Sequence, residues 1–142
     1  MSTLSAGELL RTWFEEVWNR RNAELIERYL APGGIVHNVD ESGADLHGPE
    51  AFRSFHRRIL DTFSDIEFTL HEVIESGPMA AARWSARLTH DGEGLGVPPT
   101  GQPLSLTGMA MIRAEDGRVV ESWDEWDRMR LATACGMVAP TR

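Results

Sequence analysis

The sequence contains a single cysteine, Cys135, so an internal disulfide bond is excluded. A chain of 142 residues buries enough surface to fold without a disulfide or a metal ion, and we expect residues 1–142 to form one domain. Because a lone cysteine suits a reducing compartment, we predict a cytoplasmic location. No residue that acts as a base stands beside Cys135 in the chain, so a catalytic thiol is not expected.

Lysine is absent from the sequence, and the formal net charge is −8. This charge argues against a nucleic-acid partner, because binding to phosphates depends on neutralising them with basic side chains. It also disfavours an anionic membrane surface. No apolar run reaches the roughly 18 residues that a membrane span needs. The residues Met1–Ser5 lack the basic start and following apolar stretch of a signal peptide.

Patterns that hold common cofactors and metals are also missing. The glycines of Gly92–Gly96 do not stand between a strand and a helix, so they do not form a dinucleotide-binding turn. His37, Asp40 and His47 are close in sequence, but their spacing matches no standard zinc site. We therefore expect neither a cofactor nor a metal ion.

Helical periodicity dominates the first part of the chain. Ser5 and Glu8 form a capping-box pattern, and the apolar residues that follow predict a helix over 6–21 with one broad apolar stripe. Asn22 is a suitable cap for a second, short helix, which ends before Pro32. Pro49 suits the first turn of a third helix, whose apolar residues again fall on one face.

Alternation with a period of two replaces the helical pattern after residue 65. It predicts strands over 66–74, 79–90, 104–113 and 118–126, and a short β-type run before the third helix predicts an earlier strand over 35–39. A shift in the alternation predicts a β-bulge near Glu72, and Asp116–Gly117 predicts a tight hairpin. Helices followed by an antiparallel meander, with one earlier strand, indicate an α+β fold.

Several short segments together resemble the SnoaL-like polyketide cyclase family, within the NTF2-like fold group. They are His47–Phe52, Phe63–Ile66, Ala82–Trp84, Thr89–His90, Gly96–Gly101 and Gly117–Asp124, and they run in the family's order over nearly the whole chain. The resemblance implies a cone in which a curved, mostly antiparallel sheet and three N-terminal helices enclose an apolar pocket. It also implies a homodimer formed through the outer face of the sheet.

Asp124 is the first candidate for a catalytic residue. Alternation along the last strand places it on one face with Val120, Ser122 and Trp126. A carboxyl group beside tryptophans and an apolar cavity loses hydration, so its pKa rises and it becomes a usable general base near neutral pH. The resemblance points to the same residue, because SnoaL-like cyclases use an aspartate on the last strand as acid and base. The alternative is a solvated acid on a hairpin strand.

Three further residues are candidates for assisting proton transfer. The resemblance implies that His90 lines the pocket, and His37 or Asn38 on the early strand is a possible donor to an enolate oxygen. Each also has a purely structural alternative. His90 would then be a solvated residue at the end of a strand, and His37 or Asn38 would anchor a loop. Arg83 and His90 point to opposite faces of the same predicted strand, so they cannot both face the pocket. We therefore expect Arg83 to pair with a strand acid such as Glu121.

Aromatic and methionine side chains on the strands are candidates for binding a flat, apolar substrate. They are Trp84, Met109, Met111 and Trp126, and ordinary core or dimer contacts are the alternative role. The sequence thus predicts a cofactor-independent acid/base enzyme that acts on an apolar or aromatic carbonyl substrate, by aldol ring closure or isomerisation. A non-catalytic binding module and an epoxide hydrolase are the alternatives.

Overall fold

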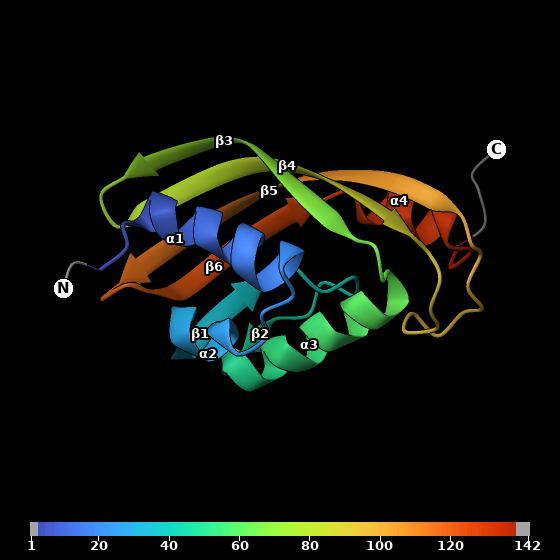
Figure 1. Ribbon diagram of the computed structural model, residues 1–142, viewed down its shortest axis with the longest axis horizontal. Helices are drawn as coiled ribbons and strands as arrows, with labels where there is room; N and C mark the ends of the chain where they lie inside the picture. Colours follow the sequence, from blue (N-terminus) through green and yellow to red (C-terminus); the bar gives the residue numbers. More distant parts are fainter. Residues whose placement is uncertain (1–2, 139–142) are drawn as a thin grey trace.

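A curved six-stranded sheet arches over a set of helices in the computed structural model, which describes residues 3–138 (Figure 1). The first helix, α1 (Ala6–Thr12), lies against the inner side of the arch, and the long helix α3 (Gly48–Thr62) closes the opposite side. This arrangement confirms the predicted α+β cone. Within the described residues, no helix combines the length and the apolar character needed to cross a membrane.

The N-terminal helix begins at the predicted capping box and changes its winding halfway along. The Ser5 hydroxyl accepts from the Glu8 backbone N–H, and the Glu8 carboxylate accepts from the Ser5 backbone N–H. Helix α1 runs directly into a π-helix, η1 (Trp13–Asn19). Because a π-helix has more residues per turn, this segment presents a broad inner face, on which Phe14, Val17 and Trp18 are buried.

Two further helices follow, with one departure from the sequence prediction. Helix α2 (Leu25–Tyr29) starts after Glu24 and has no side-chain cap. The predicted Asn22 cap is wrong, because the Asn22 side chain donates to Glu16 and only its backbone carbonyl accepts from the Leu25 N–H. Helix α3 has Pro49 in its first turn, as predicted.

The strands follow the predicted meander and add one short strand that the sequence did not reveal. They are β1 (Leu30–His37), β2 (Leu46–His47), β3 (Glu67–Ser76), β4 (Met79–Thr89), β5 (Pro103–Glu115) and β6 (Arg118–Trp126), and the short helix α4 (Arg128–Ala134) follows them. Their order across the sheet is β2-β1-β6-β5-β4-β3, in which β1 is parallel to β6 and the other pairs are antiparallel. A register shift between Leu70 and Glu72 confirms the predicted bulge.

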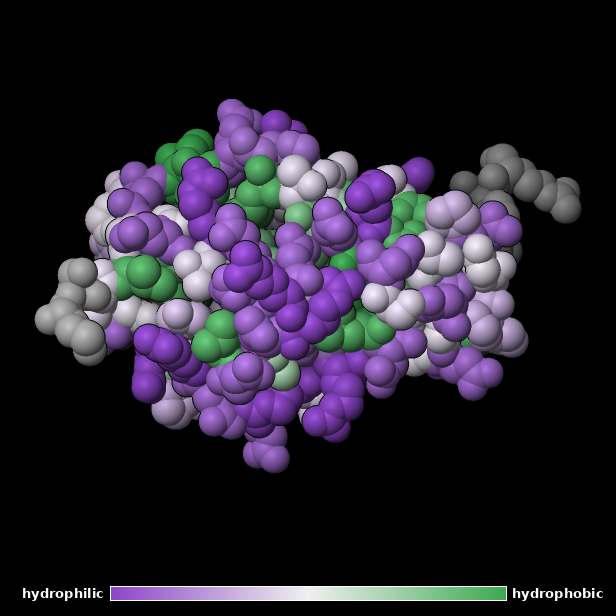
Figure 2. Space-filling model, in the orientation of Figure 1, coloured by the Kyte–Doolittle hydropathy of each residue, from purple (hydrophilic) through white to green (hydrophobic). Residues whose placement is uncertain are grey.

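Aromatic rings fill much of the space between the sheet and the helices. Trp18 makes edge contacts with Phe52 and Phe55 of α3, at 5.9 and 6.0 Å between ring centroids. On the sheet side, Phe68 of β3 packs edge-on against Trp84 of β4 at 5.2 Å. The face of the molecule shown in Figure 2 is mainly hydrophilic, with small hydrophobic patches between the hydrophilic groups. The apolar interior thus lies between the inner sheet face and the helices.

Gly108 on β5 makes room for the Trp84 ring. The two residues are register partners, and a Cβ added at Gly108 would lie 2.4 Å from Cζ2 of Trp84 and 2.8 Å from Cβ of Trp126. No real Cβ tolerates such contacts, so the indole lies directly over the glycine. The ring of Trp84 therefore extends from β4 across β5 towards β6.

Replacement Gly108→Ala should lower the free energy of unfolding by about 1–3 kcal/mol, because the added methyl group has to displace two packed tryptophans. Gly33→Ala is the matched control. Gly33 is exposed and has no atom within 4 Å of an added Cβ, so its variant should stay within about 0.5 kcal/mol of the wild type. Urea unfolding measures both values, and equal midpoints for the two variants would contradict the prediction.

Candidate active site

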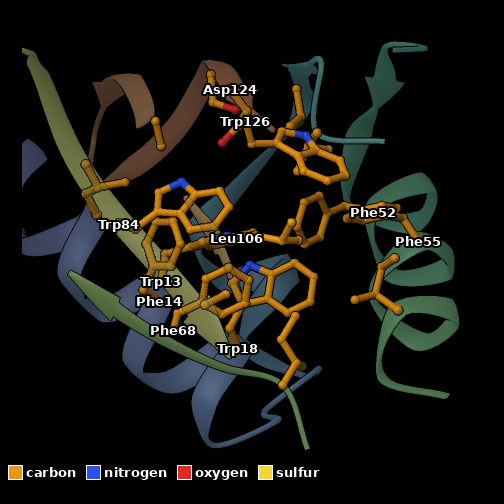
Figure 3. A pocket seen from close by; sticks show the side chains of 18 of the residues that line it. Trp13, Phe14, Trp18, Phe52, Phe55, Phe68, Trp84, Leu106, Asp124 and Trp126 are labelled. Carbon is orange, nitrogen blue, oxygen red and sulfur yellow. The ribbon is translucent and has the colours of Figure 1, made fainter. Parts of the chain in front are cut away.

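An apolar pocket lies between the inner face of the sheet and the helices α1, η1 and α3 (Figure 3). Its wall is built from aromatic and aliphatic side chains of nearly every element. They are Leu10, Trp13, Phe14, Trp18, Leu30, Val36, Val39, Phe52, Phe55, Ile59, Phe63, Ile66, Phe68, Trp84, Ala86, Leu88, Leu106, Ala110, Ile112, Val119, Trp126 and Leu131. Among the described residues that line the pocket, only Glu41, Ser122 and Asp124 depart from this apolar character.

Asp124 points into this pocket from β6, as strand alternation predicts. It stands opposite Ala110 of β5 and on the same face as Ser122 and Trp126, which also line the pocket. Val120 does not share that face, contrary to the prediction. A register shift in the pairing of β5 with β6 turns Val119 inward instead.

The apolar surroundings raise the pKa of Asp124 to about 7. Loss of hydration is the largest cause, because the charged form of a carboxyl group is the one that water stabilises most. Hydrogen bonding with the Ser122 side chain lowers the pKa, and the negative charge of Glu125 raises it. Near neutral pH, Asp124 is therefore present in both protonation states, as an acid/base catalyst needs to be.

His37 and Asn38 lie outside the pocket, so the prediction that either one reaches a substrate oxygen there is wrong. The His37 ring bridges Asp45 and Glu121, at 2.8 and 2.7 Å, and stacks on Trp123. The hydrogen bond to Glu121, followed by the one to Asp45, raises the pKa of His37. Glu121 and Trp123 are on the side of β6 that faces away from Asp124, which explains the placement.

Asn38 instead holds one wall of the pocket from behind. Its side-chain amide donates to Glu125 at 3.1 Å, and its backbone carbonyl accepts from the indole N–H of Trp126 at 2.9 Å. The backbone of Asn38 has a φ of +62°, a left-handed conformation that asparagine tolerates better than most residues. Asn38 thus orients Trp126, and it does so through its backbone.

His90 is fully buried, yet it is not among the residues that line the pocket. Its Nδ1 accepts from the Thr100 backbone N–H at 3.2 Å, which ties the following loop to the end of β4. The ring lies 5.8 Å from that of Phe63, which does line the pocket. His90 therefore sits one layer behind the wall, and the expectation that it lines the pocket is wrong.

The four predicted substrate-binding residues on the strands divide between the two faces of the sheet. Trp84 and Trp126 line the pocket, as expected. Met109 and Met111 are 58% and 40% exposed on the outer face, so their predicted contact with a substrate is wrong. Met109 and Met111 alternate with Ala110 and Ile112 along β5, and these two apolar residues take the inner face instead.

Arg83 pairs with a strand acid, as predicted, and that acid is Glu72 of β3 rather than Glu121. The Arg83 Nε atom donates to the Glu72 carboxylate at 3.1 Å. The sheet order explains the correction, because β3 lies beside β4 whereas β6 is separated from it by β5. As the parity argument required, Arg83 does not line the pocket.

Glu41 is a pocket residue that the sequence analysis missed. Arg58 of α3 binds the carboxylates of both Asp40 and Glu41, and its Nη2 lies 3.1 Å from Asp40 and 2.9 Å from Glu41. Hydrogen bonding to Glu41 is the largest cause that raises the pKa of Arg58. No sequence pattern links a loop to a helix 17 residues further along, so only the folded chain reveals this cluster.

Replacement Asp124→Asn should stabilise the protein, and the gain should grow with pH. The pKa of Asp124 is about 7 in the folded chain, against an ordinary value of 3.8, so between these values the folded state holds a proton that the unfolded chain has lost. Wild-type stability therefore falls as the pH rises from about 4 to about 7, and then levels off.

Asparagine cannot ionise, so the variant escapes this loss. We expect its advantage to be roughly 1–4 kcal/mol larger at about pH 8 than at about pH 4, as measured by urea unfolding. Asp61→Asn makes the same chemical change at an exposed aspartate and should leave the pH dependence as it is in the wild type. A parallel pH dependence for Asp124→Asn and the wild type would show that Asp124 is hydrated.

Comparisons with known proteins agree with this architecture. The family model of the SnoaL-like polyketide cyclases matches residues 8–135. The aklanonic acid methyl ester cyclase DnrD of Streptomyces peucetius is 33% identical over 122 residues, covering 84% of this chain and 80% of DnrD. The cyclase of the same description, DauD of Streptomyces sp. (strain C5), is 31% identical over 119 residues, covering 82% of this chain and 70% of DauD.

A solved structure supports the same assignment. The crystal structure of wild-type IdmH from Streptomyces antibioticus superposes with a TM-score of 0.78 at 27% identity, covering 94% of this chain and 99% of IdmH. The curved sheet and the enclosing helices are thus shared with a known protein over nearly the whole chain. With a family model that spans most of the sequence, the conclusion is direct: this chain belongs to the SnoaL-like polyketide cyclase family.

Proposed function

We propose that the protein is a cofactor-independent cyclase that closes a ring of an aromatic polyketide ester by an aldol addition, with Asp124 as its acid and base. The observation that carries this proposal is a single carboxyl group with a pKa of about 7 on the wall of an aromatic pocket. The names of DnrD and DauD, both aklanonic acid methyl ester cyclases, support the choice of substrate class.

The reaction balances with Asp124 as the one proton carrier. The Asp124 carboxylate removes a proton from the carbon next to a carbonyl group, and the electrons of the broken C–H bond form an enolate. The enolate carbon then attacks a second carbonyl carbon, which forms the new C–C bond. The oxygen of that second carbonyl takes the proton back from Asp124 and becomes a hydroxyl group. Substrate and product are isomers, so the reaction consumes no oxidant or reductant.

The shape of the pocket wall supports a flat, aromatic substrate. In Figure 3, Phe14 of η1 and Trp84 of the sheet lie on one side of the pocket, Phe52 and Phe55 of α3 lie on the other, and Asp124 stands at one end. Aromatic rings stack in offset or edge-on contacts, so such walls favour planar ring systems over flexible chains. A planar substrate held between these walls presents its edge to Asp124.

The activity should depend on Asp124 and on its ionisation. We expect Asp124→Asn to lower kcat/KM for ring closure of aklanonic acid methyl ester by roughly 10²–10⁴-fold, because a positioned base contributes about that much. In the wild type, kcat/KM should rise with pH and level off above about 7, since the carboxylate is the reactive form. Chromatography follows the isomeric product, and mass spectrometry follows deuterium uptake at the acidic carbon in D₂O.

Asp61→Asn, at an exposed position, serves as the control and should retain wild-type activity. Tight binding of the ester without turnover or deuterium uptake by the wild type would replace this proposal with that of a binding module. Hydrolysis of an epoxide, without action on ketones or esters, would point instead to Asp124 activating water.

We further propose that the protein forms a homodimer through the outer face of the sheet. Met109 and Met111, exposed side by side on that face with one residue between them, support an apolar contact there. The double variant Met109→Glu/Met111→Glu should sediment as a monomer, whereas Met129→Glu, at an exposed site on α4, should not change the mass. A monomeric wild type, or a dimeric double variant, would contradict the proposal.

A further inference from the structure

The indole N–H of Trp84 has no acceptor, although the residue is only 6% exposed. Among residues 3–138, the two buried side-chain nitrogens without a partner are Nε1 of Trp84 and Nε2 of His90, and only Trp84 lines the pocket. A buried donor without a partner costs free energy of about 1–3 kcal/mol. The neighbouring Trp126 shows the usual solution, since its N–H donates to the Asn38 carbonyl.

The position of this N–H is set by Gly108. The Cε2 atom of Trp84, which is bonded to Nε1, lies 2.7 Å from the point that a Cβ of Gly108 would occupy. Cβ of Trp126 on β6 lies 2.8 Å from the same point. The nitrogen edge of the ring is therefore over β5, next to the strand that carries Asp124. In Figure 3, the indole nitrogen is on the edge of the ring nearer to Asp124.

We propose that the Trp84 N–H binds the carbonyl oxygen of the substrate whose neighbouring carbon Asp124 deprotonates. This inference rests on the proposed function and names the group that receives the enolate charge. When Asp124 takes the proton, the electrons of the C–H bond move into the carbonyl group and leave a negative charge on its oxygen. A fixed N–H donor stabilises that oxygen more strongly than it stabilises the neutral carbonyl, which lowers the barrier.

Other polar groups near Asp124 are already engaged. The Ser122 side chain interacts with Asp124 itself and lowers its pKa, and the Trp126 N–H is bonded to Asn38. His37 and Glu121 pair with each other on the other side of β6. Trp84 Nε1 is closed to water, so a substrate oxygen reaches it through a small movement of the surrounding side chains, as is common on ligand binding.

The test compares two ligands that differ only in a carbonyl group, 1-tetralone and tetralin. Replacement of Trp84 by Phe, or by the benzothienyl analogue in which sulfur replaces the N–H, should weaken 1-tetralone binding by about 5–10-fold, which is the worth of one hydrogen bond. Tetralin binding should change less than about twofold. The infrared C=O band of bound 1-tetralone should move back to higher frequency in both variants.

Exchange of the acidic hydrogens of 1-tetralone in D₂O provides the kinetic readout. The benzothienyl variant should exchange about 10–100-fold more slowly than the wild type, because it lacks the donor to the enolate oxygen. Trp123→Phe, on the outer face, should bind and exchange like the wild type. Unfolding midpoints confirm that each variant is folded, and the benzothienyl analogue keeps the shape of the ring if Trp84→Phe does not fold.

The outcomes separate the two proposals. The wild type could catalyse no exchange and still prefer 1-tetralone over tetralin in a way that depends on the Trp84 N–H. That result would refute the proposed function and keep Trp84 as the donor to the carbonyl oxygen. Exchange that needs Asp124 but is the same with the benzothienyl analogue would refute the Trp84 assignment alone. The Trp84 assignment would also be overturned if the Trp84 variants lost equal affinity for 1-tetralone and tetralin. It would likewise be overturned if the wild type bound 1-tetralone no more tightly than tetralin.

Discussion

The partial removal of one carboxyl group from water, at the half-buried Asp124, is the constraint around which the rest of this site is organised. Asp124 keeps a proton up to a pKa of about 7 only because the pocket around it offers almost no polar contact. The fold meets this constraint with an arched sheet and aromatic helix faces that surround the carboxyl group with rings. Protein interiors normally close such spaces by packing. Here the curvature of the sheet and the rigid aromatic walls hold the space open beside Asp124.

The aromatic walls are positioned mainly by backbone features. The left-handed backbone of Asn38 presents a carbonyl to the Trp126 N–H, and Gly108 leaves a flat surface for Trp84. The π-helical winding of η1 broadens the helix face that carries Trp18. These features explain why the rings of the pocket wall have defined positions although the side chains are chemically similar. Each large ring has one place to lie, and that place is set by a neighbouring strand or turn.

Local periodicity was sufficient to predict the order of helices and strands and the residues on the same strand face as Asp124, whereas the cone and its pocket were implied by the resemblance to the SnoaL-like family. The sequence did not predict which face of a strand is buried where both faces carry apolar residues. Along β5, Met109 and Met111 alternate with Ala110 and Ile112, and both sets are apolar, so alternation alone does not tell which is inside. Val120 was misplaced by a bulge that no residue type marks.

Long-range pairing was the second source of error. His37 and Asn38 were predicted near the substrate from their chemistry, but the parallel pairing of β1 with β6 brings the His37 ring to Glu121 on the outward side. Glu41 joins the pocket only because Arg58 holds it there from another element. Such contacts depend on which strands and loops become neighbours, and this information is spread over the whole chain rather than present in any short segment.

The ion pair between Glu41 and Arg58 distinguishes this carboxylate from that of Asp124, the proposed base. Two carboxylates on one pocket wall would normally raise each other's pKa and share a proton. Arg58 pairs with both Asp40 and Glu41, and Glu41 is not among the groups that shift the pKa of Asp124. Loss of hydration, rather than repulsion, is accordingly the largest cause of the raised pKa of Asp124. Of the two acidic side chains that line the pocket, Glu41 is held in an ion pair, whereas the pKa of Asp124 is raised to about 7, which suits the proposed reaction with a single proton carrier.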